Sequence, residues 1–523
     1  FFVDGVRDDV QYYRPLYNIE QVEILRGPNA LLFGRGGAGG ILNRVTKKAE
    51  IGEDFNGYSF AIDTFGATEG QIDSNFSISE NSAFRMNGYF DTFENHRDFS
   101  DGDGFGLNPT VKFELSDQTT LDVSYEYVDY DRSIDRGIPT GADGEPVDAL
   151  NDIVFGDPDL NKSEFEAHTL RAMLQHEFSD TFKGIFTASY TSYDKLYQNF
   201  YASGYDEANT PDRVTLDGYV DTTERQNFVL SSNFVSEFET GDIEHTLLFG
   251  AEFIDSSSEN DRYKAAFDDG AGGTTDTKSF SISQSNLSGV GFNAGGLDAG
   301  PFTDLKDDTA TDLTVYSLYV QDEIQLTEQL DLVLGARFDS FDIDVTDKEP
   351  GGTDGSQKDE KFTPRAGIIY KPQENVSLYA SYSQTFLPQS GEQFANLGDE
   401  GLDPDEFTNL EAGVKWDFAS GYSLTASIFQ IEQDIVQADG AGGFETPDKQ
   451  VTGVEAQFNG QITDQRSITD GYGYLEGETA DGKTPRQLPE HTFSIWKHYQ
   501  LSENFLLGLR PLHHDDRNHT APT

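Results

Sequence analysis

Most of this chain alternates apolar and polar residues along segments of roughly 10 to 18 residues, which predicts long β-strands. In the segment TTLDVSYEYVD, Leu121 and Val123 share one face of such a strand, while Asp122 and Ser124 share the other. Each predicted strand therefore has one apolar and one polar face. The same alternation recurs at 316–326 and 330–339.

Two kinds of connection separate these segments. Tight ones, such as LTEQL and FASGY, span a few residues, as β-hairpin turns do. Short turns at one end and long loops at the other are typical of an outer-membrane β-barrel. A soluble sandwich usually has shorter strands, and strands of this length outside a barrel would leave an exposed edge. The long connections are rich in Gly, Asp, Ser and Thr and lie at 133–162, 198–222, 255–310, 345–360, 386–406 and 437–449.

We count roughly eighteen predicted strands from residue 54 onward, with a nineteenth cut short. That number lies above the porin range and approaches the 22-stranded transporters whose lumen is plugged. No stretch of 18 apolar residues occurs, so no transmembrane helix is predicted. The sequence predicts an all-β protein built on a transmembrane antiparallel β-barrel.

Composition and charge narrow the class further. The 523 residues include 52 Gly, 40 Phe and 24 Tyr but only 2 Met and no Cys, which suits strands and turns and excludes disulfides. Asp and Glu number 93 against 36 Lys and Arg, a formal net charge of -57. Nucleic acid is not expected as a partner, since phosphate binding needs a clustered basic surface. This acidic excess instead indicates a solvated surface suited to a salty medium.

A glycine-rich stretch near the start, ALLFGRGGAGGILNRV, invites a different interpretation. Gly34, Gly36 and Gly39 have the G-x-G-x-x-G spacing of a dinucleotide-binding turn. However, Pro28 interrupts the apolar run before them, the following ILNRVTKK is too short and β-branched for the required helix, and no alternation of strands and helices follows. We therefore expect these glycines to allow tight turns and close backbone packing, and not to bind a nucleotide.

Three segments within residues 1–48 together carry a family resemblance: VDGV, VEILRGP and FGRGGAGGILNRVTK. In this order they resemble the second half of the plug domain of TonB-dependent siderophore receptors, and GLDPDEFTNLEAGVKWDF resembles a late barrel segment of the same family. The resemblance implies a 22-stranded barrel with an N-terminal plug inside it. We expect truncation at both ends, because the first half of the plug, the TonB box and the closing strands are missing from the pattern.

The resemblance also divides the chain and assigns roles within the plug. The expected parts are the C-terminal part of the plug at 1–50, an incomplete barrel at 51–510 and an aberrant tail at 511–523. An unpaired ion inside a barrel is costly, and the resemblance places Glu23, Arg26 and Arg44 in a charged cluster that locks the plug to the barrel. The expected backbone turns of the plug use Gly27, Gly34, Gly36, Gly39 and Gly40.

The segment RDDVQYYRPLY is the expected ligand-facing loop of the plug. Guanidinium groups can pair with and stack on a ferric catecholate, which is an aromatic anion, and tyrosines supply ring faces and hydroxyls. Packing on the barrel wall is the alternative role for these tyrosines. No protein ligand to the iron itself and no metal site is expected, because a whole chelate is bound. The candidate ligand-binding residues are Arg7, Gln11, Tyr12, Tyr13, Arg14 and Tyr17.

Together these features predict a transporter, not an enzyme, in the outer membrane of a Gram-negative bacterium. By resemblance it imports a ferric siderophore, of the catecholate or a similar type, and is energised through the TonB-ExbB-ExbD complex. It binds no cofactor directly, since iron is carried as the chelate, and its other partners are outer-membrane lipid and lipopolysaccharide. Import of another scarce solute, such as cobalamin or an oligosaccharide, is an alternative, as is a non-transporting surface barrel such as an adhesin.

Overall fold

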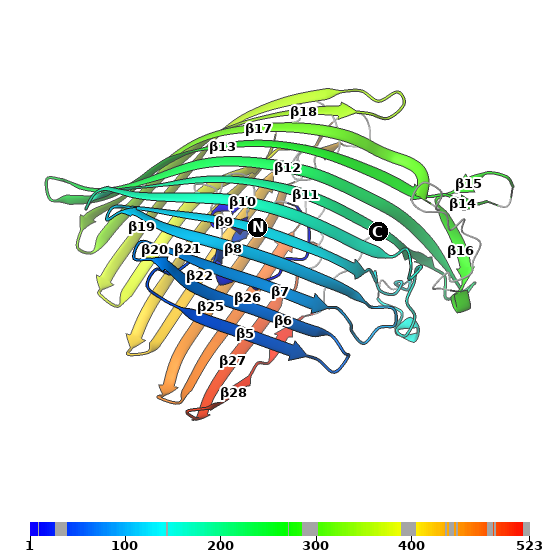
Figure 1. Cartoon of the computed structure of the whole chain (residues 1–523), viewed down its shortest axis with the longest axis horizontal. Helices are drawn as coiled ribbons and strands as arrows, with labels where there is room; N and C mark the ends of the chain where they lie inside the picture. Colours follow the sequence, from blue (N-terminus) through cyan, green and yellow to red (C-terminus); the bar gives the residue numbers. More distant parts are fainter. Residues whose placement is uncertain are drawn as a thin grey trace.

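The structure is a computed structural model that describes residues 1–8, 10–26, 39–142, 145–269, 271–284, 302–388, 404–434, 437–438, 444–445, 448–478, 485 and 488–515. Its N-terminal residues form a small sheet inside a large barrel (Figure 1). The sheet has the order β2-β1-β4-β3, in which β1 and β4 are parallel. Its strands are β1 (Phe2–Val3), β2 (Val6–Arg7), β3 (Ile19–Arg26) and β4 (Gly40–Thr46).

The barrel consists of long antiparallel strands that follow one another in chain order. The described residues form eighteen long barrel strands. Two short strands, β28 and β29, pair with successive parts of β27 and together make an interrupted nineteenth strand. This confirms the predicted fold class and strand number. The long strands are β5 (Phe55–Ile62), β6 (Thr68–Ser79), β7 (Ser82–Thr92), β8 (Gly102–Ser116), β9 (Thr119–Ser133), β10 (Lys162–Ser179), β11 (Phe182–Tyr205), β12 (Arg213–Thr240), β13 (Ile243–Ala265), β17 (Phe302–Thr327), β18 (Leu330–Asp347), β19 (Gly355–Gln373), β20 (Val376–Leu387), β21 (Asp405–Ala419), β22 (Tyr422–Asp434), β25 (Asp448–Thr463), β26 (Arg466–Glu478) and β27 (His491–Ser502).

The remaining elements are short. Strand β28 is Phe505–Leu509, and β29 is Leu512–His514, so strand pairing continues into the segment that we expected to be a tail. Outside the barrel wall lie β14 (Phe267–Asp268), β15 (Thr274–Thr275), β23 (Gln437–Ala438), β24 (Phe444–Glu445) and the 3-10 turns at Asp148–Leu150 and Ile282–Gln284, while β16 (Thr277–Ser281) pairs with β12. In the described part of the chain, no helix is long and apolar enough to cross a membrane.

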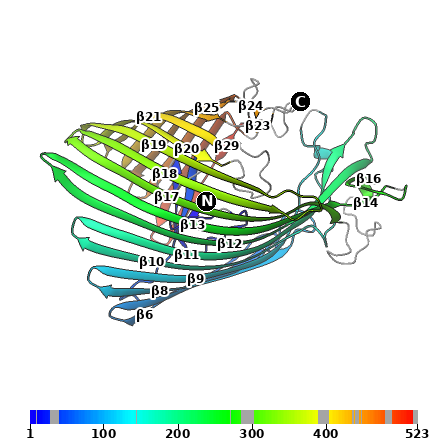
Figure 2. The ribbon, with the colours of Figure 1, turned by 90° about the horizontal axis from the view of Figure 1, so that it is seen from above.

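The strands β11, β12, β13 and β17 are much longer than a membrane crossing needs. Strand β12 has 28 residues, whereas a tilted transmembrane strand needs about 9–11. Two-residue turns join the strands at one end, as between Thr240 and Ile243, while long connections join them at the other. Figure 2 shows the long strands converging on the cluster of loops that contains β14 and β16. By the asymmetry of outer-membrane barrels, that end is the extracellular one.

Alternation along each strand sends one set of side chains into the lumen and the other outward. On the lumenal face, Arg337 is 1% exposed and pairs with Asp339 at 2.8 Å and Glu252 at 2.9 Å. On the outer face, Tyr316 is 59% exposed and Leu318 is 63% exposed. The polar face predicted from the sequence therefore lines a filled lumen, and the apolar face is the outer surface.

Two bands of aromatic rings run along the outer face of the longer strands. The upper band includes contacts of Phe253 with Phe228 at 6.4 Å and with Tyr316 at 5.2 Å between ring centroids. The lower band includes Phe234, whose ring lies 5.1 Å from Phe249 and 5.9 Å from Phe182. On β13 the two bands are four residues apart, at Phe249 and Phe253, which is about 13 Å along the strand. Because the apolar band of a membrane barrel is about 25 Å tall, both sets of rings belong to its lipid-facing surface.

Above the upper aromatic band, five neighbouring strands carry an acidic row on their outer face. Each acid lies directly opposite the next, an arrangement that like charges make unfavourable. The row is not visible in the sequence, because it depends on the register of four separate strand pairs. Its members are Asp129, Glu166, Asp194, Glu224 and Glu259.

Candidate functional site

Asp8, which follows β2, is the centre of a polar network that joins the plug to the barrel. Its side-chain oxygen Oδ2 accepts hydrogen bonds from Arg14 Nε at 2.9 Å, Arg44 Nη2 at 2.5 Å and the Tyr12 hydroxyl at 3.0 Å. Its Oδ1 accepts one from the hydroxyl of Tyr193 in β11 at 3.3 Å. Burial, and then the charge of Asp8, raises the pKa of Tyr12 well above its usual value, so its hydroxyl remains a donor.

Asp4, in the turn between β1 and β2, forms a second link with the wall. It accepts hydrogen bonds from the amide and hydroxyl of Thr46 at 2.9 and 2.6 Å, and it pairs with Lys48 Nζ at 3.1 Å. Arg171 of β10 lies 3.3 Å away, and both side chains of that pair are buried. Burial raises the pKa of the Asp4 carboxyl, but Arg171, Lys48 and Thr46 together outweigh it and hold the pKa below its ordinary value.

A third link lies where the plug leaves for the first barrel strand. Lys47 Nζ is 3.0 Å from Asp73 of β6, and Arg85 of β7 is 2.8 Å from the same carboxylate. Arg85 also pairs with Glu50 at 2.9 Å and donates to the carbonyl of Lys48 at 2.9 Å. Opposite charges of plug and barrel therefore meet at two of the three links, through Asp4 and Lys47, while Asp8 reaches the barrel through a tyrosine hydroxyl.

The predicted locking residues occupy different places in these networks. Arg44 acts through Asp8, while Glu23 accepts hydrogen bonds from Gln21 at 3.0 Å and Asn43 at 2.8 Å, both within the plug. Arg26 ends β3, and its side chain lies outside the described residues. The locking role of Glu23 and Arg26 stays a prediction. The residues that the structure places in contact with the barrel, and that the sequence did not single out, are Asp4, Asp8, Asn18 and Lys47.

Of the five glycines predicted to form turns of the plug, the structure describes the last two. Gly40 begins β4 with a φ of +132°, a backbone conformation that other residues rarely adopt, which supports a turn at this position. Gly39 is exposed, and a side chain there would meet nothing within 4 Å. Gly27, Gly34 and Gly36 lie outside the described residues.

Two of the predicted ligand-binding tyrosines pack against the barrel wall instead of facing an open space. The ring of Tyr12 stacks on Phe165 of β10 with centroids 4.3 Å apart. Tyr17 is 2% exposed and lies 4.7 Å from the ring of Tyr89 in β7. These positions match the packing alternative for these residues.

The other four predicted ligand-binding residues divide into exposed and engaged groups. Gln11 is exposed, and Tyr13 is half-exposed beneath the guanidinium of Arg132, whose carbon lies 4.0 Å from its ring centroid. Arg14 is held by Asp8 and by backbone carbonyls, and Arg7 lies in β2 with its guanidinium over the Phe2 ring. Gln11 and Tyr13 are therefore the exposed members of the predicted set.

Above the plug, the lumenal face of β11 carries a column of tyrosines and one lysine. Tyr193 contacts the plug, and the residues that share its face, Lys195, Tyr197 and Tyr201, continue for about 26 Å toward the extracellular loops. Among the described residues, Lys195 forms no hydrogen bond or ion pair. The sequence YTSYDKLYQNFY could have indicated this column, because its two-residue alternation continues beyond the length of a membrane crossing.

Neighbouring strands extend this tyrosine column into a wall. Tyr219 of β12 stacks near Tyr197, with centroids 6.0 Å apart, and its hydroxyl accepts a hydrogen bond from Arg136 at 2.9 Å. Arg262 of β13 lies 4.9 Å from the Tyr219 ring centroid and forms two hydrogen bonds with Asp221. We call this surface on β11, β12 and β13, with Arg136, the vestibule wall.

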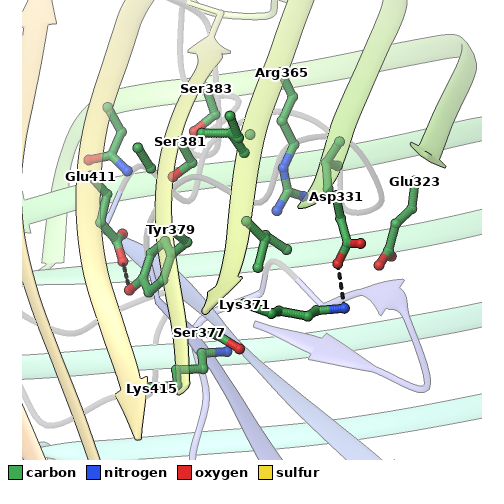
Figure 3. Close-up of a pocket in the computed structure, with 16 residues that line it drawn as sticks. Glu323, Asp331, Arg365, Lys371, Ser377, Tyr379, Ser381, Ser383, Glu411 and Lys415 are labelled. Atoms are coloured by element: carbon green, nitrogen blue, oxygen red, sulfur yellow. Dashed lines mark hydrogen bonds and ion pairs between the residues drawn. The ribbon is translucent and has the colours of Figure 1, made fainter. Parts of the chain in front are cut away.

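A second polar region lines the lumen on the far side, along β17 to β21 (Figure 3). It surrounds a cavity of about 430 Å³. Asp331 pairs with Lys371 at 2.5 Å, and the Tyr379 hydroxyl donates to Glu411 at 2.6 Å. The Arg365 guanidinium points into the same cavity in Figure 3. An adjoining cavity of about 370 Å³ extends from this wall to Ile24 and Leu25 of β3, so lumenal space continues beside the plug.

No group of three or more His, Asp or Glu side chains in the described part of the chain is arranged to hold a metal ion. The vestibule wall carries cations, hydroxyls and aromatic faces, together with two carboxylates, of which Asp221 is paired with Arg262 and Asp217 accepts a hydrogen bond from Tyr201. The ammonium group of Lys195, which is unpaired among the described residues, and the aromatic faces suit an anionic or aromatic solute better than a bare cation. The geometry thus defines a plugged outer-membrane barrel with a polar vestibule above its plug.

Comparisons with known proteins agree with this class. Residues 106–515 match the family of the TonB dependent receptor-like β-barrel, and residues 1–41 match the TonB-dependent receptor plug domain. The probable TonB-dependent siderophore receptor PiuA of Acinetobacter baumannii is 26% identical, over 98% of this chain and 74% of its own length. The catecholate siderophore receptor Fiu of Escherichia coli K12 is 24% identical, over 97% of this chain and 72% of its own length.

A solved structure shows the same architecture. The crystal structure of PiuA aligns with a TM-score of 0.86 at 25% identity, covering 98% of this chain and 79% of that one. The chain belongs to the TonB-dependent receptor family, whose members are receptors and transporters of the Gram-negative outer membrane. The family resemblance, fold class and location predicted from the sequence are thereby confirmed.

Proposed function

We propose that this receptor binds a ferric siderophore between the plug apex and the vestibule wall and imports it across the outer membrane. The observation that carries the proposal is the concentration of tyrosines and cations on one lumenal surface of a protein whose net charge is -57. Long-range repulsion of an anionic chelate does not prevent binding, because the Debye length is about 8 Å at physiological salt. The names of the relatives PiuA and Fiu support the same ligand class.

The proposed contacts follow from the chemistry of the chelate. Tyr13 and Gln11 present an aromatic face and an amide from below, and Lys195 presents an ammonium group from the side. Arg136 and Tyr219 close the upper part of the space. An anionic chelate with aromatic groups, such as a catecholate, can use all three kinds of contact at once.

Transport requires that the plug move, and the energy for that movement comes in this proposal from the TonB-ExbB-ExbD complex. The ion pairs of Asp4 and Lys47, and the hydrogen bond from Tyr193 to Asp8, hold the plug against the wall until then. The chelate is cargo, so the protein performs no chemical reaction on it and needs no cofactor of its own.

Binding of ferric dihydroxybenzoate to the purified chain, followed by quenching of intrinsic fluorescence, tests the proposal. Lys195→Gln should weaken binding about tenfold, because it removes one charge-assisted contact of roughly 1.5 kcal/mol. Lys183→Gln on the same strand is the matched control, since Lys183 lies near the periplasmic turn and is 57% exposed. Equal affinity of the wild type and both variants would exclude the vestibule wall as the binding surface.

A further inference from the structure

The outer surface of the barrel contains a hollow of about 720 Å³ that spans β10, β11, β12, β13 and β17. Four small side chains form its floor. Ala172 lies opposite Ala188 in one row, and Ser232 lies opposite Ala251 in the next row toward the periplasm. Because neighbouring strands are about 4.8 Å apart, the floor from β10 to β13 is about 14 Å long.

Large apolar side chains flank this floor on both sides. Leu230 lies opposite Ala188, and Leu174 and Leu318 lie in the row of Ser232 and Ala251. The rims therefore rise well above the alanines, and the hollow is a groove with an almost wholly apolar lining. The rim residues are Leu174, Phe186, Leu230, Phe253, Tyr316 and Leu318.

The groove lies between the two aromatic bands of the outer face. Phe253 and Tyr316 of the upper band form its extracellular rim. Phe234 of the lower band contacts Phe186, the periplasmic rim, at 5.4 Å between ring centroids. The groove is therefore continuous with the surface that faces the hydrocarbon core of the membrane. Strands β10 to β13 and β17 lie side by side in Figure 1, where this part of the wall can be followed.

We propose that this groove is a lipid-binding site that holds one acyl chain of a membrane lipid. Inside the membrane, the hydrophobic effect does not drive an acyl chain onto an apolar protein surface, because the surrounding lipid is equally apolar. The chain must therefore be held by close packing. A chain lying in the groove contacts protein atoms on its floor and on both rims, whereas a chain on a flat strand surface contacts them on one side. Water is a poor occupant, because the lining offers it almost no hydrogen-bond partners.

The shape of the groove favours a hydrocarbon chain over other occupants. Its long, narrow floor fits an extended chain, and a polar headgroup would lose its hydrogen bonds between Leu230 and Leu318. Its volume falls within the range of about 300–1,000 Å³ that is usual for small-molecule sites. The bound chain would remain with the protein when the surrounding lipids exchange.

The test reconstitutes the full chain in vesicles of phosphatidylethanolamine that carry a photoreactive diazirine in one acyl chain. After illumination, mass spectrometry of peptides locates the labelled residues. Labelling should concentrate on β10 to β13, and it should be lost in the variant with Ala188→Leu and Ala251→Leu, whose side chains fill the floor. The matched control carries Ala412→Leu and Ala426→Leu, two alanines that face outward on β21 and β22 and lie outside this groove.

Three results would overturn the proposal. Labelling spread evenly over all lipid-facing strands would show ordinary contact with bulk lipid, and unchanged labelling in the groove-filling variant would show that the chain lies elsewhere. Cross-linked dimers that disappear in that variant would assign the groove to a second copy of the chain instead. If the variant fails to fold, as judged by heat-modifiable gel mobility, the labelling map of the wild type still decides between the groove and bulk lipid.

Discussion

Replacing Arg171 by methionine should loosen the plug. The Asp4 and Arg171 side chains are 3% and 8% exposed and lie 3.3 Å apart, so the substitution leaves a buried carboxylate without one of its cations. Breaking a buried ion pair typically costs about 3–5 kcal/mol. Lys48 and Thr46 still contact Asp4, which places the expected cost at the lower end, about 3 kcal/mol.

Amide hydrogen exchange of the plug strands measures this cost directly. A loss of about 3 kcal/mol in the free energy of plug opening corresponds to roughly 100-fold faster exchange in β1 and β4. The matched control is Arg213→Met, because Arg213 lies at the extracellular end of β12 and bonds Ser279. Exchange in the plug should be unchanged in that control.

A double substitution separates the ion pair from general damage to the barrel. Asp4→Asn together with Arg171→Met removes both charges, so it should cost less than Arg171→Met alone. Exchange in β1 and β4 at the wild-type rate in Arg171→Met would refute the reasoning that this pair holds the plug.

Three further expectations follow from the described contacts. The pKa of Asp4 is lowered in the folded protein, so its contribution to plug anchoring is complete above the ordinary aspartate pKa of 3.8. That contribution is lost as the pH falls through the lower pKa of the folded state. Asp4→Asn should therefore remove this acid dependence of amide hydrogen exchange in the plug. Gly40→Ala should destabilise the plug by about 1–3 kcal/mol, read as faster exchange in β4, because φ is +132°. Glu166→Gln should raise the unfolding temperature at low ionic strength and lose that effect in high salt, since Glu166 has acids opposite it on both sides; a salt-independent change would contradict the electrostatic cause.

Local patterns sufficed for the strands and the class of fold. The alternation of Leu121 and Val123 with Asp122 and Ser124 assigns each residue to a face, because successive side chains of a strand point in opposite directions. The resemblance of residues 1–48 to a plug added the placement of the first strands. Neither pattern shows whether a polar side chain in the lumen contacts the plug or contacts other residues of the barrel wall.

The candidate site was predicted less completely than the fold. Tyr13 and Gln11 are exposed, whereas Tyr12 and Tyr17 pack against the barrel wall and Arg14 is paired with Asp8. Packing against a wall depends on where Phe165 and Tyr89 lie, and those residues are far away in sequence. The role of the predicted ligand-binding residues stays a prediction that the binding experiment tests.

By itself, the sequence determined that this protein is an all-β outer-membrane barrel, because alternation and turn chemistry act over a few residues. The plug was predicted from the resemblance of residues 1–48 to a known family. The tertiary structure alone decided which charges meet. Asp4 and Arg171 are 167 positions apart, and the acidic row and the lipid-facing groove exist only because four or more strands pair in one register. Shifting one strand by a single residue would turn its side chains to the opposite face, so contacts across strands are a property of the closed sheet.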